Sequence, residues 1–134
     1  MEQFNLSFGT INKLHEHLAE VIIDDGVEMN LKMVNEYHQF LISHFNAPFS
    51  LLVNKIHSYS YDVQAQEMLA TIEQIKDMAV VSYKPSTTFT TEVLANYPRK
   101  TKWHLKIFHN REAAIQWLEN NLNNNNTDYK ESSN

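Results

Sequence analysis

The chain of 134 residues contains no cysteine. This absence excludes disulfide bonds, a thiolate nucleophile and any metal site with thiolate ligands. Only two glycines are present, Gly9 and Gly26, so the chain has no glycine-rich phosphate-binding loop. The Gly-x-Ser-x-Gly motif of serine hydrolases is also missing. Because no nucleophile, base or carboxylate pair is arranged along the sequence, we expect a protein that is not an enzyme and that uses no cofactor.

Long hydrophobic runs are absent as well, since no window approaches the roughly 20 apolar residues that a membrane-spanning helix needs. The first residues, Met1–Asn5, show no basic patch before an apolar run, so we expect no signal peptide. The formal net charge of −5 argues against nucleic acid as the main partner. Apolar residues make up 43% of the chain, which is enough for a buried core. The sequence therefore predicts a soluble, cytoplasmic domain.

The chain divides into one domain and a tail. Residues 1–120 carry the apolar stretches, and we expect them to form a single domain of ordinary size. Residues 121–134 are rich in asparagine and carry too little apolar surface to offset the entropy of ordering them. We therefore expect this tail to be disordered.

Apolar stretches of strand type alternate with stretches of helical spacing. Strands are predicted at Phe4–Leu14 with a bend at Gly9, and at Leu18–Ile23, Phe49–Val53, Met78–Val81 and Thr101–Phe108. Helices are predicted after Asn30, after Asp62 as far as Ile75, from Pro85 to Pro98, and after Asn110. A short turn at His15–His17 predicts one antiparallel pair, whereas the repeated βα units predict parallel pairs. The alternation of Lys102–Ile107 places the last strand at an edge of the sheet. The fold class is therefore α/β.

Three stretches of the sequence resemble the STAS domain, and in particular its branch similar to SpoIIAA, an anti-sigma-factor antagonist. These stretches are Gly26–Leu31, Phe49–Val53 and Lys106–Leu118. The resemblance implies a superhelix of βα units around a mixed, mostly parallel sheet of about five strands and four helices. It also implies a non-enzymatic bacterial signalling domain that regulates a partner protein by docking to it.

The resemblance further implies a phosphorylated Ser or Thr after the third strand, at the start of the following helix. The corresponding stretch, Asn54–Asp62, contains Ser58 and Ser60, although the acidic residue and the glycine of the family's turn are absent. A phosphate near a helix N-terminus is favoured by the free N–H groups there. Tyr59 and Tyr61 flank the two serines, either as a recognition surface or as packing over the loop.

Two further clusters are candidates for binding. The first is the dense basic run Arg99, Lys100, Lys102, His104 and Lys106, which could receive an anion or an acidic partner or simply form a solvated strand face. The second is the pair His15 and His17, which would share a face of a strand. Two histidines without further ligands are weak evidence for a metal, so we expect a solvated turn and no metal site.

Three functions follow from these observations. The first is a protein-interaction domain that docks through the surface around Lys55–Asp62 and the neighbouring helix, with an unknown protein as its partner. The second is a carrier or sensor of a small apolar ligand, such as a lipid, in a pocket beside the sheet. Its candidate lining residues are aromatic: Phe8, Tyr59, Tyr61, Tyr83 and Phe89. The third and weakest is an enzyme that uses histidines and carboxylates.

Overall fold

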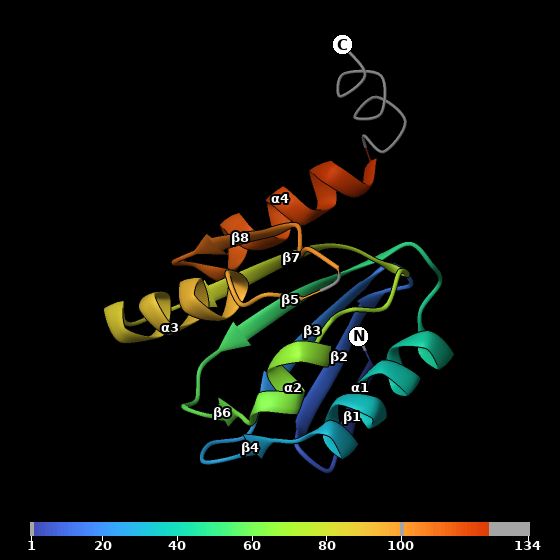
Figure 1. Ribbon diagram of the computed structural model, residues 1–134. Helices are drawn as coiled ribbons and strands as arrows, with labels where there is room; N and C mark the ends of the chain where they lie inside the picture. Colours follow the sequence, from blue (N-terminus) through green and yellow to red (C-terminus); the bar gives the residue numbers. More distant parts are fainter. Residues whose placement is uncertain (1, 100, 124–134) are drawn as a thin grey trace.

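The computed structural model describes residues 2–99 and 101–123 and shows an α/β fold (Figure 1). The strands are β1 (Glu2–Leu6), β2 (Gly9–His15), β3 (Leu18–Ile23), β4 (Glu28–Met29), β5 (Phe49–Lys55), β6 (Ser60–Tyr61), β7 (Ile75–Ser82) and β8 (Leu105–Phe108). The helices are α1 (Leu31–His44), α2 (Val63–Met68), α3 (Pro85–Ala95) and α4 (Arg111–Asn123). The predicted alternation of strands and helices is thereby confirmed for the described residues.

Six strands form the main sheet in the order β1-β2-β3-β5-β7-β8, and β4 and β6 form a small parallel pair. The pairs β1–β2 and β2–β3 are antiparallel, as predicted for the turn at His15–His17. The pairs β3–β5, β5–β7 and β7–β8 are parallel. The predicted mixed, mostly parallel sheet and the edge position of the last strand are therefore confirmed.

The two faces of the sheet carry separate hydrophobic cores. The larger core lies beneath α1 and α2 and includes Phe8, Tyr37 and Leu51. The smaller core lies on the opposite face, where Ala114 and Leu118 of α4 pack on the strands. Figure 1 shows α4 on its own side of the sheet, away from α1 and α2. Central strands such as β3 and β5 are covered on both sides, which explains their nearly continuous apolar sequence.

The sheet has six strands where the sequence predicts about five. Gly9 does not bend one strand, because it begins β2 after a tight connection from β1. A Cβ atom at Gly9 would lie 2.2 Å from the carbonyl oxygen of Ile22, so glycine lets β2 approach β3 closely. The connection, Ser7–Phe8, lacks the Asn-Gly type of sequence that usually marks a hairpin, which is why the pattern does not reveal it.

Helix α2 is shorter than predicted and ends at Met68. A longer helix would join the N–H of Ala70 to the carbonyl of Gln66, but each group has another partner. The N–H of Ala70 donates to Nε2 of His38 at 3.0 Å, and the carbonyl of Gln66 accepts from Arg99 at 2.9 Å. Because both partners lie more than 25 residues away, the apolar spacing overestimates the helix.

Other boundaries differ from the prediction as well. Strand β7 runs from Ile75 to Ser82 where Met78–Val81 is predicted, β5 extends to Lys55, and α3 ends at Ala95, before the predicted Pro98. Ser60 and Tyr61 belong to β6, within a stretch predicted as loop. The last strand begins at Leu105 and not at Thr101. Helix α4 continues to Asn123, three residues beyond the predicted end of the domain, and residues 124–134 of the predicted tail lie outside the described residues.

Candidate functional site

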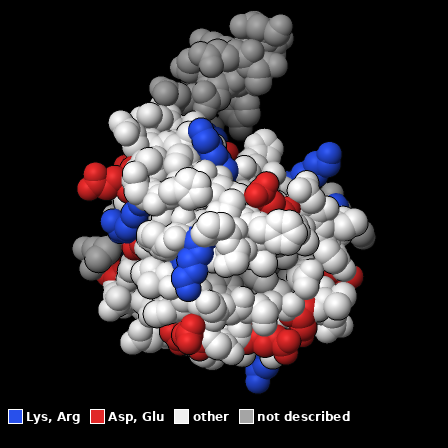
Figure 2. Space-filling view, turned by 90° about the vertical axis from the view of Figure 1, so that its left-hand side faces the viewer, with Lys and Arg blue, Asp and Glu red and all other residues white. Residues whose placement is uncertain are grey.

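The parallel strands β3, β5, β7 and β8 end at the same edge of the sheet, toward which their arrowheads point in Figure 1. Ligands of open α/β sheets bind outside the carboxyl ends of the strands, so this edge is the place to look for a site. Figure 2 shows the molecule from that side, with charges of both signs scattered over a mostly uncharged surface. The chemistry at this edge therefore depends on individual side chains and not on a broad charged patch.

A hollow of about 210 Å³ opens at this edge, between the loop after β5 and the first turns of α3. Its lining is rich in hydroxyl groups and carries two basic side chains: Lys55, His57, Ser58, Tyr59, Ser86, Thr87 and Thr90. We call it the hydroxyl hollow. Both sides come from segments that follow neighbouring parallel strands, β5 and β7, so the fold itself brings them together.

Helix α3 points its N-terminus at the hydroxyl hollow. The helix begins at Pro85, and the side chain of Lys84 at the N-cap makes no capping hydrogen bond. N–H groups in a first turn have no acceptor within the helix and lie at the positive end of its dipole. An anion in the hollow would therefore meet favourable N–H groups beside Ser86 and Thr87.

Ser58 lies in an exposed loop that the β3–β4 turn holds in place. Its N–H donates to Oδ1 of Asp25 at 3.1 Å, and its carbonyl accepts from the N–H of Gly26 at 2.8 Å. Gly26 has a φ of +79°, a conformation that favours glycine. These bonds place Ser58 at the hydroxyl hollow.

The two candidate serines differ in their surroundings. Ser60 pairs with Glu28 in the small β4–β6 sheet and does not line the hydroxyl hollow. The resemblance predicts these serines at the start of the next helix, α2, but Asp62 already caps that helix by accepting from the N–H of Ala65 at 2.8 Å. Ser58 instead lines the hydroxyl hollow together with Ser86 and Thr87 in the first turn of α3.

Tyr59 and Tyr61 pack together beneath this loop. Their rings meet edge to face with centroids 5.5 Å apart, and both pack against the larger core. Burial raises the pKa of Tyr61 to about 12 and raises that of Tyr59 well above its ordinary value. Both hydroxyls are therefore neutral at pH 7, and the packing interpretation accounts for both rings.

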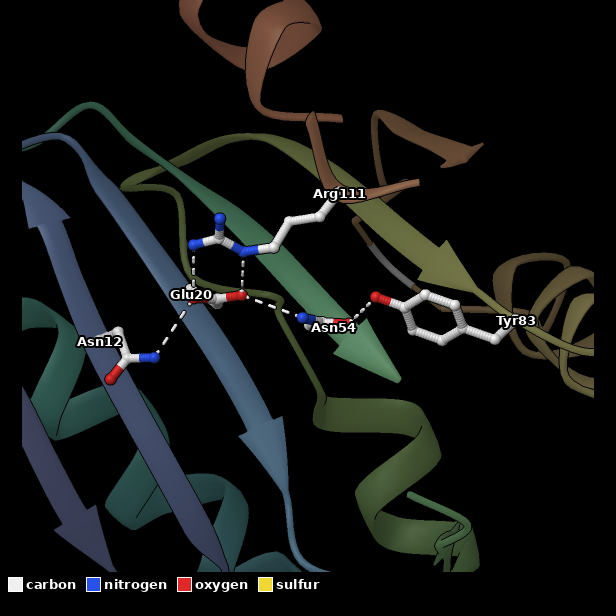
Figure 3. A network of polar contacts seen from close by, with 5 residues as sticks. All are labelled: Asn12, Glu20, Asn54, Tyr83 and Arg111. Carbon is white, nitrogen blue, oxygen red and sulfur yellow. Dashed lines mark hydrogen bonds and ion pairs between the residues drawn. The ribbon is translucent and has the colours of Figure 1, made fainter. Parts of the chain in front are cut away.

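On the opposite face of the sheet, a polar network holds the end of β5 (Figure 3). Arg111, the first residue of α4, donates to both carboxylate oxygens of Glu20 at 2.7 and 2.9 Å. Glu20 also accepts from Nδ2 of Asn12 at 3.2 Å and from Nδ2 of Asn54 at 3.0 Å. Oδ1 of Asn54 in turn accepts from the hydroxyl of Tyr83 at 2.7 Å. Because successive strand residues point to opposite faces, fixing Asn54 on this face directs the next residue, Lys55, toward the hydroxyl hollow.

The network also keeps Glu20 ionised. Burial alone pushes the pKa of this carboxyl up, but hydrogen bonds from Arg111, Asn54 and Asn12 outweigh it and hold the pKa below the ordinary value. Glu20 and Arg111 are not among the candidate residues predicted from the sequence. The available signal was a carboxylate within the apolar run Leu18–Ile23, because a buried charge requires a partner.

The basic run does not form one continuous patch in the described residues. The guanidinium of Arg99 donates to backbone carbonyls of Gln66 and Leu94 and lies 3.8 Å from the ring centre of Trp103, so it holds α2 and α3 together. Lys102 and His104 are exposed in the segment before the last strand, and Lys106 is exposed on β8. Lys100 lies outside the described residues.

The two histidines of the β2–β3 turn have separate partners. Nε2 of His15 lies 2.6 Å from Oε1 of Glu119, and Nδ1 of His17 lies 2.8 Å from the carbonyl oxygen of Asn46. Across residues 2–99 and 101–123, no three His, Asp or Glu side chains come together as ligands for a metal ion. These contacts tie the turn to α4 and to the end of α1.

The proposed aromatic lining of a ligand pocket is dispersed. Phe8 is fully buried and packs on Tyr37 in the larger core. Tyr83 and Phe89 are 50% and 67% exposed and line an open hollow of about 370 Å³ beside α3. Tyr61 lines an apolar cavity of about 20 Å³ beside the sheet, which has room for a water molecule but not for an organic ligand. The five aromatics therefore do not surround one cavity.

Comparison of the chain with models of protein families, with curated proteins and with solved structures finds no match. The STAS resemblance accordingly stays a prediction from the sequence. Within the described part of the chain, every helix is too short or too polar to cross a membrane.

Proposed function

We propose that this protein is a non-enzymatic interaction domain, of the type that the STAS resemblance implies, whose docking surface is the carboxyl edge of the sheet. Ser58 is the residue through which phosphorylation would control the docking. The observation that carries this proposal is the position of Ser58 in the hydroxyl hollow, beside the N-terminus of α3 and two basic side chains.

A phosphate on Ser58 would add close to two negative charges at neutral pH. It would be stabilised by the first-turn N–H groups of α3 and by His57 and Lys55, which line the same hollow. The modification would fill an open, hydroxyl-lined recess with a phosphate group. A partner that recognises the unmodified edge would lose contacts and meet new negative charge.

Exposed apolar side chains support docking at this edge. Ile56 and Val63, which flank the Ser58 loop, are 53% and 61% exposed, and Phe89 of α3 is also solvated. A partner docked at this edge would cover these side chains. The carrier hypothesis lacks comparable support, since the apolar cavity beside the sheet is only about 20 Å³.

The matched variants Ser58→Asp and Ser60→Asp test the proposal. Tagged wild-type protein and both variants are expressed in the cells of origin, and co-purifying proteins are quantified by mass spectrometry. We expect at least one protein to be captured about tenfold less by Ser58→Asp, a loss of about 1.4 kcal/mol in binding. Ser60→Asp should capture it like wild type, because Ser60 lies outside the hollow.

Peptide mapping of the wild-type protein from the same cells should show phosphate on Ser58. Thermal unfolding of both variants verifies that each remains folded. Equal capture by wild type and Ser58→Asp, together with an unmodified Ser58, would contradict the proposal.

A further inference from the structure

The side-chain amine of Lys55 lies between two recesses and is partly shielded from water. Lys55 is the last residue of β5, is half-buried, and lines both the hydroxyl hollow and the apolar cavity beside the sheet. Its Nζ donates to Oγ1 of Thr91 at 2.8 Å and lies 5.7 Å from the ring centre of Tyr59. The hydroxyl of Thr91 itself donates to the carbonyl of Thr87, so its oxygen is oriented as an acceptor for the amine.

The described residues that line the two recesses beside this amine include no Asp or Glu. The titratable groups around Lys55 are Tyr59 and Tyr61 from the loop and β6, Tyr37 from α1, and His57. The three tyrosines keep their protons at neutral pH because burial raises the pKa of each.

Burial without a counter-ion disfavours the ammonium form and lowers the pKa of Lys55 to about 8. About a tenth of the side chain is then the neutral amine at pH 7, against less than about 0.1% for an exposed lysine. The neutral amine is the nucleophilic form of lysine, and desolvation of this kind activates lysines toward carbonyl compounds.

We propose that Lys55 is a reversible covalent binding site for a small, uncharged aldehyde that enters through the hydroxyl hollow. The lone pair of Nζ attacks the carbonyl carbon, and the carbonyl oxygen takes up a proton to give a carbinolamine. Loss of water then leaves a C=N bond between Nζ and the aldehyde carbon, and hydrolysis reverses the reaction. No oxidant or reductant takes part.

The surroundings suit this chemistry. The hydroxyl hollow, at about 210 Å³, admits an aldehyde of a few carbons to the amine. Hydroxyl groups of Ser58 and Thr87 line it and can hydrogen-bond the oxygen that develops on the former carbonyl. The short alkyl part would stay in the hydroxyl hollow beside Tyr59, because the apolar cavity on the other side of Lys55 has room only for a water molecule. The reaction requires neither phosphorylation nor a partner, and its test uses protein with an unmodified Ser58, so the outcome does not depend on the proposed function. A phosphate on Ser58 would occupy the same hollow.

Trapping with propanal and cyanoborohydride tests the proposal on the wild-type protein at pH 7. Cyanoborohydride reduces each imine to a stable propyl amine, and peptide mapping gives a rate for each lysine. Lys84 is the matched control, because it lies exposed at the start of α3, near the same hollow. We expect Lys55 to react at least tenfold faster than Lys84 and its rate to saturate with propanal concentration, while that of Lys84 rises linearly.

Two further measurements test whether the fast reaction of propanal depends on the folded structure and on Lys55 itself. In denaturing urea the preference for Lys55 should disappear, because the recesses that desolvate it are lost. In Lys55→Arg the fast, saturable phase should be absent. A rate at Lys55 equal to or below that at Lys84, a linear dependence on propanal, or a preference that persists in urea would each overturn the proposal.

Discussion

His38 is a buried side chain that makes the stability of the fold depend on pH. It lies on the inner side of α1, 7% exposed, and its Nε2 accepts a hydrogen bond from the N–H of Ala70. Ala70 has a φ of +55°, in the left-handed region that is uncommon for alanine. The neutral imidazole therefore serves as the acceptor for a turn that leaves α2.

Burial lowers the pKa of His38 to about 4. Unfolded chains take up a proton on histidine near pH 6.5, whereas the folded protein does not until the pH is much lower. The stabilisation that the buried, neutral imidazole of His38 contributes is therefore complete above about pH 6.5 and is lost as the pH falls toward 4. We expect the free energy of unfolding to fall by about 2 kcal/mol between pH 7.5 and pH 5.

Urea unfolding at a series of pH values measures this loss. The variant His38→Gln retains an acceptor for Ala70 but does not titrate in this range, so its unfolding free energy should be nearly flat between pH 7.5 and pH 5. An equal slope in the variant would show that another group is responsible.

At the scale of elements, the apolar spacing of α3 does not match which of its residues are buried. Phe89 and Val93 recur at helical spacing, yet both are solvated, and the apolar contact of this helix with the core comes from Leu94. The helix lies beside the carboxyl end of β7, where its inner side carries Thr91 in contact with Lys55. The site therefore occupies the side of α3 that a core-forming helix would fill with apolar residues.

We expect Phe89→Ser to change the free energy of unfolding by no more than about 0.5 kcal/mol, because the ring is solvated. The matched control, Phe49→Ala, removes a fully buried ring of β5 and should cost about 3–5 kcal/mol. Urea denaturation of both variants makes the comparison. A cost above about 1.5 kcal/mol for Phe89→Ser would mean that this ring is packed in solution.

At the scale of the whole molecule, the pair Glu20–Arg111 joins layers that are distant in sequence. Arg111 begins α4, which covers one face of the sheet, and Glu20 lies at the centre of β3. The carboxylate is 4% exposed and the guanidinium 40% exposed, so only Glu20 is fully removed from water. Losing Arg111 would leave a buried carboxylate with only amide donors from Asn12 and Asn54.

We expect Arg111→Gln to lower the free energy of unfolding by about 2 kcal/mol, less than for a fully buried pair because Arg111 is partly solvated. Lys106→Gln, at an exposed position of β8, should change it by less than about 0.5 kcal/mol. Chemical denaturation of Arg111→Gln, Glu20→Gln and the double variant Glu20→Gln/Arg111→Gln measures the coupling, with Lys106→Gln as the control. Additive effects in the double variant would contradict a direct contribution of the pair.

The sequence by itself determined the alternation of elements. Nearly continuous apolar runs at Leu18–Ile23 and Phe49–Val53 predict strands covered on both faces, and these strands form the centre of the sheet. Asn30 and Asp62 begin helices where predicted, because their side chains accept hydrogen bonds from N–H groups three residues later. Such signals are local, so a single sequence is enough to read them.

Only the tertiary structure decided which side chains meet. Ser58 and Ser86 are 28 positions apart, and Glu20 and Arg111 are 91 positions apart, yet the parallel crossovers bring the members of each pair together. The exposure of Phe89 and the end of α2 at Met68 also depend on distant partners. Local spacing sets the period of an element, whereas its buried side and its chemical neighbours follow from how the elements pack.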